Sequence, residues 1–356
     1  MILTILSFII VLGVIIFVHE LGHFLAAKIV GIRVETFSLG FPPKMISKKI
    51  GDTEYVIAWV PLGGYVKMAG MVDESMDDKP LTGAPWEFMS KNFWQKTFVI
   101  SAGVMMNFVL GIAVFFALTW MIGVAQVDKP VVGSVVPDYP ASAAGIQVGD
   151  LILSINGDSI ATWAQLTQII HSNPGEEILM VWRRGEQLDS ARIMPIRKEF
   201  SQGDSTFTLG LIGINPKPEF QKVGFFRSVT RGFEITGFII TQSLKVVKML
   251  ILGQTSLNDV AGPVGIAQIS GQTIRSGAVD FISLIAQVSV SIGLLNILPF
   301  PVLDGGHIVF IVIEAVLRRP ISTKVKLNVQ KVGLALILAF FLLVTYHDIL
   351  RLIFGP

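Results

Sequence analysis

The sequence has 356 residues, of which 52% are hydrophobic and only 15% are charged. Soluble domains carry about 25% charged residues, so this composition excludes a soluble globule, a disordered chain and a collagen-like chain. The formal net charge is only +2, whereas a nucleic-acid partner requires a concentrated basic excess, so we expect no nucleic acid. The chain has no cysteine. Any metal site must therefore use His, Asp or Glu.

Four uncharged apolar segments are each long enough to cross a bilayer, which takes about 20 residues in a helix. They cover residues 2–18 with a continuation to Lys28, residues 97–127, residues 281–303, and the run that starts after Lys331. The first segment lacks the basic residues that begin a signal peptide and carries three ionisable side chains, so we expect it to be retained. The chain is predicted to be a polytopic α-helical membrane protein with four transmembrane helices.

Basic residues near the ends of the spans predict their orientation, because short loops rich in Lys and Arg stay in the cytoplasm. The segment 28–96 has Lys28 and Arg33 at one end and two lysines, Lys91 and Lys96, at the other. The segment 305–331 has Arg318, Arg319 and three lysines against a single acid, Glu314. We expect both segments on the cytoplasmic face. Both chain termini and the segment 128–278 are then expected on the opposite side.

The segments between the spans differ in composition. Residues 32–41 and 53–68 are rich in β-branched and aromatic side chains and predict strands. These strands form either a small soluble sheet or a sheet that dips into the membrane, which is allowed only where the backbone is paired or faces a cavity. Residues 128–217 have the composition and turn signals of a soluble β-rich domain. Residues 220–253 alternate apolar with charged residues and predict an amphipathic helix on the membrane surface or against the bundle.

The first span carries the sequence His19-Glu20-Leu21-Gly22-His23, an H-E-x-x-H motif. In a helix, residues four apart share a face, so both imidazoles can bind one Zn²⁺ while Glu20 lies beside them as a general base. Ionisable groups inside a span are costly and mark function by default. The alternative is a polar cluster that only holds helices together.

Zinc hydrolases use three protein ligands and keep one position open for water. The third apolar run ends in Asn296-Ile-Leu-Pro-Phe-Pro-Val-Leu-Asp304-Gly-Gly-His307. This run and the first span both reach their ionisable residues at the cytoplasmic end, so Asp304 is the expected third ligand and His307 the less favoured substitute. Taken alone, an Asp before Gly-Gly is more typical of a turn.

These two motifs together resemble those of the site-2 protease family of intramembrane zinc metalloproteases, and within it the bacterial regulator-of-sigma-E protease group. The resemblance covers nearly the whole chain. It includes Pro140-Ala141, Ala144-Gly145-Ile146 and the run 149–157 (GDLILSING), which resemble a PDZ domain of the bacterial protease type, and the GPVGI sequence at 262–266. One PDZ signature fits within this length.

The resemblance implies residue roles. It implies one Zn²⁺ per chain held by His19, His23 and Asp304, with Glu20 activating water and Asn296 contacting the substrate backbone or the oxyanion. It also implies that the strand-rich segment pairs with extended substrate. The substrate-binding residues expected there are Val56, Ile57, Ala58, Trp59, Gly63, Gly64 and Tyr65.

The implied substrates are transmembrane proteins such as anti-sigma factors or remnant signal peptides, and the PDZ domain is expected to bind a peptide C-terminus or to act as a size filter. The implied location is the bacterial cytoplasmic (inner) membrane. An alternative function is a non-catalytic metal-binding scaffold that presents the PDZ module. A transporter is disfavoured because no inverted repeat is apparent.

The expected domain order follows from these segments. It begins with a first span with H-E-x-x-H (1–27), a membrane-associated β region (28–96), a second span (97–126) and the PDZ domain (127–217). An amphipathic helix with the GPVGI linker (218–278), a third span (279–304), a cytoplasmic loop (305–331) and a fourth span (332–354) follow.

Overall fold

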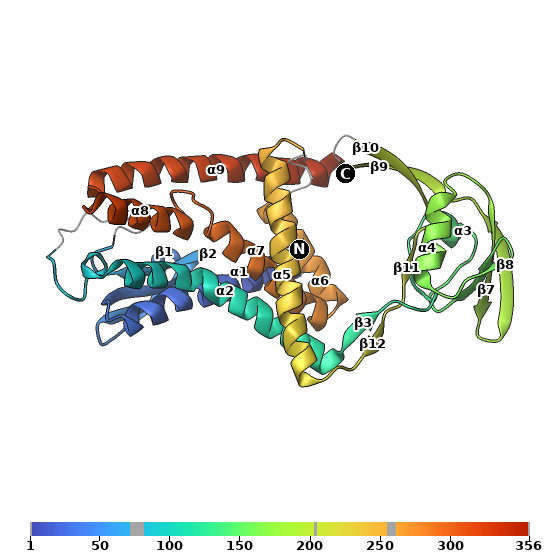
Figure 1. Cartoon of the computed structure of the whole chain (residues 1–356), viewed down its shortest axis with the longest axis horizontal. Coiled ribbons are helices and arrows are strands. Elements are labelled where there is room, and N and C mark those ends of the chain that lie inside the picture. Colours follow the sequence, from blue (N-terminus) through green and yellow to red (C-terminus); the bar gives the residue numbers. More distant parts are fainter. Residues whose placement is uncertain (1, 72–81, 203–204, 255–260, 355–356) are drawn as a thin grey trace. The chain divides into compact units, whose positions relative to one another are not determined.

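The computed structural model describes residues 2–71, 82–202, 205–254 and 261–354 (Figure 1). The chain divides into two compact units. Met1–Leu118 and Phe225–Pro356 form one, here called the helical unit, and Thr119–Gly224 forms the other, here called the inserted unit. The inserted unit is wider than the predicted domain at 127–217 because it also contains the chain segments that lead into and out of it.

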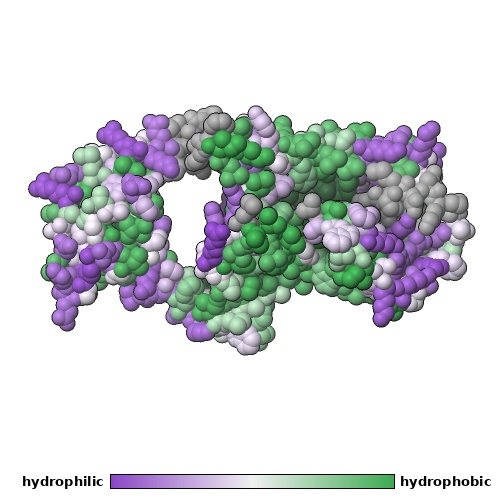
Figure 2. Space-filling view, turned by 180° about the vertical axis from the view of Figure 1, so that it is seen from behind, coloured by the Kyte–Doolittle hydropathy of each residue, from purple (hydrophilic) through white to green (hydrophobic). Residues whose placement is uncertain are grey.

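The helical unit is built from seven helices among the described residues. They are α1 (Ile2–Ile29), α2 (Phe93–Ile122), α5 (Phe225–Ile251), α6 (Pro263–Ser276), α7 (Ala278–Asn296), α8 (Asp304–Leu317) and α9 (Thr323–Phe354). In the described part of the chain, α1, α2, α7 and α9 are long and apolar enough to span a membrane. Hydrophobic side chains cover much of the surface of this unit (Figure 2), including exposed residues such as Phe341 and Leu342. The predicted four-span membrane fold is confirmed.

The helices pack through apolar clusters and through glycines. Val11 and Ile15 of α1 are fully buried against Phe281 and Ile285 of α7. Where α1 meets α2, a side chain on Gly22 would collide with the Ala102 carbonyl. Small residues allow such close approach of helices in a membrane, and this one brings α2 directly against the H-E-x-x-H turn.

Strands β1 (Val34–Ile50) and β2 (Thr53–Met68) form an antiparallel sheet that confirms the predicted strands. The prediction ended the first strand at 41, whereas the structure continues it to Ile50. The chain segment 36–39 pairs both with 64–67 and with 54–57, and 54–57 pairs in addition with 46–49. In this sheet 54–57 is therefore an inner strand, whereas 64–67 has one partner among the described residues.

The third apolar run does not continue as one helix to Asp304. Helix α7 ends at Asn296, residues 297–303 form turns that contain Pro299 and Pro301, and α8 begins at Asp304. Proline lacks the N–H that a helix interior needs, which explains the break. The segment 305–331, predicted as a loop, contains most of α8 and the first turns of α9.

Helix α5 confirms the predicted amphipathic helix and runs across the other helices of its unit (Figure 1). The GPVGI sequence, predicted as a linker, instead starts helix α6. The Asp348 carboxylate of α9 accepts hydrogen bonds from the N–H groups of Gly262, at 3.3 Å, and Gly265, at 2.8 Å. A methyl group on Gly262 would collide with this carboxylate, so the glycine permits the contact.

The inserted unit consists of short strands and two helices around one apolar core centred on Trp182. Its elements are β3 (Val124–Gln126), β4 (Val132–Val135), α3 (Pro140–Ala143), β5 (Leu151–Ile155), β6 (Asp158–Ser159), α4 (Trp163–Ser172), β7 (Ile178–Arg184), β8 (Gln187–Ile193), β9 (Ile196–Gln202), β10 (Ser205–Leu211), β11 (Ile214–Pro216) and β12 (Glu219–Gln221). The largest sheet has the order β6-β5-β7-β8.

The buried Asp150 and the partly exposed Arg184 form an ion pair at the border of this core. Asp150 is fully buried and accepts hydrogen bonds from Arg184, at 2.8 and 2.7 Å, and from the Gln147 N–H at 2.8 Å. Burial disfavours the charged carboxylate, but the hydrogen bonds from Arg184 and Gln147 outweigh it, and the pKa of Asp150 lies below its usual value. The Asp of the GDLILSING run therefore has a structural role.

Candidate metal centre

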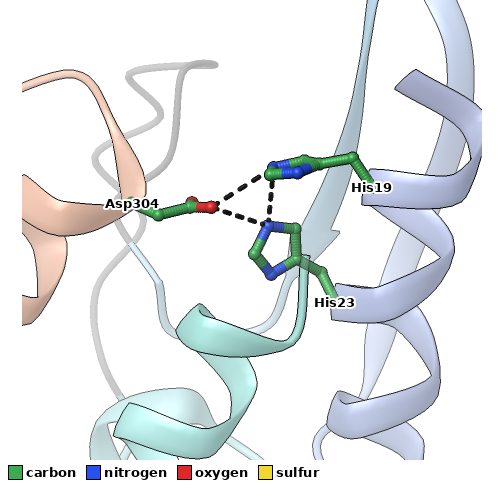
Figure 3. A group of neighbouring side chains, drawn as sticks. All are labelled: His19, His23 and Asp304. Atoms are coloured by element: carbon green, nitrogen blue, oxygen red, sulfur yellow. Dashed lines mark hydrogen bonds and ion pairs between the residues drawn. The ribbon is translucent and has the colours of Figure 1, made fainter. Parts of the chain in front are cut away.

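Helix α1 presents His19 and His23 on one face, one turn apart, and both side chains point toward Asp304 (Figure 3). The Nε2 atoms of the two histidines are 3.2 Å apart. Asp304 Oδ2 lies 3.2 Å from His19 Nε2 and 3.4 Å from His23 Nε2. Among the described residues, these three form the group of His, Asp and Glu side chains able to hold a metal ion. The side chains of His19, His23 and Asp304 thus lie together, as the sequence predicted.

Asp304 reaches the histidines because it begins α8 directly after the proline-broken segment. A Cβ on Gly305 would lie 2.5 Å from the Ile297 carbonyl carbon, and one on Gly306 would lie 2.8 Å from the Phe300 carbonyl carbon. Only glycine fits at such separations. The Gly-Gly pair thus lets α8 fold back tightly onto the end of α7 and places the Asp304 carboxylate beside α1.

The three ligand atoms fit a zinc ion. Ligands about 2.0–2.1 Å from a tetrahedral centre stand about 3.3 Å from one another, which matches the observed 3.2–3.4 Å. Asp304 Oδ2 is buried and has no hydrogen-bond partner among the described residues, an arrangement that is costly unless a cation or a proton compensates it. Two imidazoles and one carboxylate are also the donor types that zinc prefers.

Helix α2 forms the wall behind the two histidines. The Val99 carbonyl accepts a hydrogen bond from His23 Nδ1 at 2.9 Å, and the Asn107 amide lies 3.2 Å from His19 Nδ1. Between them, a Cβ on Gly103 would lie 2.8 Å from His23 Cε1 and 2.9 Å from His19 Cε1. No motif in the sequence predicts these residues, although the spacing of four between Gly103 and Asn107 places them on one helix face.

The remaining predicted residues lie around this centre. Asn296, at the end of α7, has its amide nitrogen 3.5 Å from His19 Nε2. Glu20 is partly exposed on α1, and a Cβ on Gly64 of β2 would lie 3.2 Å from Glu20 Cγ, so the sheet closely approaches the motif here. His307 does not join the group; its Nε2 lies 3.4 Å from Gln330 Nε2.

The predicted substrate-binding residues fall into two groups. Val56 and Ile57 have strand partners on both sides, so their backbone is already paired, and Ala58 pairs with Lys44. Gly64 and Tyr65 belong to the segment with one strand partner. Trp59 is 65% exposed, and Gly63 lies against the ring of Phe41. Because Gly64 and Tyr65 have one strand partner each among the described residues, their segment keeps a backbone edge to which another strand can add.

The inserted unit contains a groove of about 360 Å³ within its own fold. It lies between helix α4 and the chain around β11, and its walls are largely apolar, with Trp163, Leu166 and Ile214 among them. Thr167 and His171 of α4 supply polar groups at this groove.

Comparison with known proteins adds a family match. The model of the family described as "Peptidase family M50" matches residues 7–340. The zinc metalloprotease RasP of Geobacillus kaustophilus is 32% identical over 97% of both chains, and a putative zinc metalloprotease of Clostridium perfringens is 35% identical over 94% of this chain and 95% of the relative. A solved PDZ domain of an SdrC-like protein from Listeria monocytogenes matches 26% of this chain and 90% of its own, at 25% identity and a TM-score of 0.20.

Proposed function

Because the chain belongs to peptidase family M50, the site-2 protease family of zinc metalloproteases, we propose that it hydrolyses peptide bonds in or near the transmembrane segment of single-span membrane proteins. The observation that carries this proposal is the meeting of His19, His23 and Asp304 at tetrahedral spacing, on and beside a spanning helix. Glu20 lies within the same helical turn. Anti-sigma factors and remnant signal peptides are the proposed substrate types.

We propose one zinc ion per chain, held by His19, His23 and Asp304. When bound, zinc supplies a Lewis acid that lowers the pKa of water and polarises a carbonyl. Glu20 takes the proton of the attacking water and returns it to the leaving amine. The Asn296 amide donates a hydrogen bond to the substrate carbonyl oxygen as that atom gains charge, a contribution on the order of 3 kcal/mol.

The decisive experiment compares the purified wild-type protein with Glu20→Gln, measuring zinc content and cleavage of a single-span substrate. The variant is expected to keep zinc and to lose cleavage by about 10²- to 10⁴-fold, because only the proton acceptor is removed. Glu54→Gln is the matched control, since Glu54 pairs with Lys44 on the sheet and is not part of the group of candidate metal ligands. A Glu20→Gln protein that cleaves like the wild type would contradict the proposal.

The alternative function, a metal-bound scaffold that presents the inserted unit to partners, gives a different result in the same experiment. A scaffold needs the histidines but has no use for an acid between them. Glu20→Gln would then alter neither zinc content nor partner binding, and the wild-type protein would not cleave.

A transmembrane substrate must be unwound before hydrolysis, because a helix hides its carbonyls in hydrogen bonds. We propose that the edge at Gly64 and Tyr65 holds the unwound segment by strand addition, beside Glu20. Tyr65→Pro removes a backbone donor from this edge and is expected to lower cleavage while zinc content stays unchanged. Unaltered cleavage by a protein with an intact sheet, measured by hydrogen exchange, would refute this role.

The groove of the inserted unit is proposed to bind a peptide C-terminus. Thr167→Trp fills the groove, whereas Gln168→Trp adds the same bulk one residue along α4, outside the groove lining. If the groove recruits substrate, only the first variant lowers cleavage. If the unit instead filters substrates by size, deletion of 128–217 permits cleavage of untrimmed substrates.

We place the protein in a bacterial cytoplasmic membrane, with both termini and the inserted unit outside. The absence of cysteine makes this orientation testable with single-cysteine variants. Ser190→Cys on exposed β8 is expected to react with a membrane-impermeant maleimide in intact cells. Lys48→Cys on exposed β1 is expected to react only after permeabilisation. The reverse labelling pattern would overturn the orientation.

A further inference from the structure

Asn107 is a fully buried polar residue within the spanning helix α2. Polar side chains are costly inside a membrane, and those that occur there mark functional sites. Its neighbours include the Ser289 hydroxyl, which donates a hydrogen bond to the Asn107 backbone carbonyl at 3.2 Å, and the ring of His19. The Asn107 Oδ1 atom has no hydrogen-bond partner among the described residues.

The contact with His19 controls which ring nitrogen carries the proton. When the amide nitrogen of Asn107 faces Nδ1, that nitrogen must accept, so the ring proton resides on Nε2, the atom that faces His23 and Asp304. A protonated Nε2 has no lone pair for a metal. When the amide is turned by 180°, Oδ1 accepts from Nδ1–H and the Nε2 lone pair is free.

Turning the amide breaks no hydrogen bond of Oδ1, because this atom has no hydrogen-bond partner among the described residues. The two amide orientations also occupy the same volume. Asn107 can therefore adopt the accepting orientation in place.

We propose that Asn107 is the positioning residue that selects the zinc-binding tautomer of His19. The inference rests on the proposed zinc site and adds a residue from a third helix to it. The Val99 carbonyl does the same for His23, since a carbonyl can only accept and so requires the proton on Nδ1, 2.9 Å away. One face of α2 thus prepares both imidazoles, in the way that outer-shell acceptors orient the histidine ligands of zinc.

Two substitutions separate this role from packing. Asn107→Leu removes both the donor and the acceptor, whereas Asn107→Asp keeps acceptors only and has nearly the same shape. Zinc affinity is measured on the purified full-length protein by competition with a chromophoric chelator. Outer-shell substitutions cost about 10- to 100-fold in metal affinity, and this loss is expected for Leu. The Asp variant is expected to stay within about threefold of the wild type or to bind more tightly.

Ser289→Ala is the matched control. Ser289 is also fully buried and contacts Asn107, but its hydroxyl donates to the Asn107 backbone carbonyl and not to the side chain that meets His19. Its loss removes a buried hydrogen bond at the same place, and zinc affinity is expected to remain that of the wild type. If the Leu variant does not fold, Asn107→Ala takes its place in the comparison with Asp.

Two results would overturn the proposal. The first is wild-type zinc affinity in the Leu or Ala variant, and the second is an Asp variant that loses as much affinity as Leu. Failure of the proposed function gives a different pattern, because a wild-type protein that binds no zinc or cleaves no substrate fails before any variant is compared.

Discussion

Gly103 offers a direct test of how tightly α2 surrounds the metal ligands. In Gly103→Ala the new methyl carbon would lie 2.8 Å from His23 Cε1 and 2.9 Å from His19 Cε1, and it would overlap His23 Nε2 more closely still. Ordinary contacts begin near 3.4 Å. The rings must therefore retreat by at least about 0.5 Å, whereas zinc–ligand distances tolerate only about 0.2 Å.

The expected magnitudes follow from this displacement. Overpacking costs about 1–3 kcal/mol, and replacing glycine by alanine within a helix returns about 1 kcal/mol. The metal-free protein should therefore lose at most roughly 2 kcal/mol of stability. Substitutions of outer-shell residues already lower metal affinity by up to about 100-fold. Because Gly103→Ala displaces the ligands themselves, zinc affinity should fall by more than about 100-fold, or about 2.7 kcal/mol.

The assay is zinc titration of the metal-free protein against a competing chelator, with thermal unfolding measured in parallel. Gly111→Ala is the matched control. Gly111 lies in the same helix as Gly103, but the nearest atom to its new methyl group would belong to Val290 of α7 and not to a metal ligand. The control should lose stability but keep zinc affinity. A folded Gly103→Ala protein that binds zinc within about threefold of the wild type would refute the close α2 wall.

Three further predictions concern other parts of the chain. The pKa of Asp150 is lower in the folded protein than in the unfolded chain, so its contribution to stability is present at neutral pH and is lost as the pH falls below about 4. Asp150→Asn should therefore destabilise the inserted unit at pH 7 and make its stability less dependent on acid pH, as measured by urea unfolding at several pH values. Gly64→Val should push β2 away from α1 and lower cleavage while zinc content, measured by atomic absorption, stays constant. Asp348→Leu should leave buried N–H groups at the start of α6 unpaired and cost about 1–3 kcal/mol in thermal unfolding, with zinc affinity unchanged.

The parts of the centre that could be predicted are those with a local sequence signal. His19 and His23 share a face by helical spacing alone, and Asp304 was placed by the matching depth of two spans. The amphipathic pattern likewise located α5, and the β-branched runs located β1 and β2. Each of these inferences needs only the chain period and the charge pattern.

What could not be predicted depends on tertiary packing. Helix α8 was missed because it is short and begins with Asp304-Gly-Gly, a sequence with poor helix propensity that tight packing against residues 297–300 overrides. Asn107 and Gly103 were missed because a single small or polar residue in a long apolar run carries no local signal. The backbone pairing of Val56 and Ile57 depends on the register of a sheet that only the folded chain defines.

The paired strands β3 and β12 hold the two ends of the inserted unit together where the chain leaves α2 and returns to α5. Entry and exit therefore lie side by side, and the polypeptide between them behaves as a cassette. Because of this layout, the inserted unit can be duplicated, exchanged or lost during evolution without a change in the chain path of the helical unit. It also gives an engineer a natural splice point, at which a short turn joining Gln126 to Glu219 should close the chain.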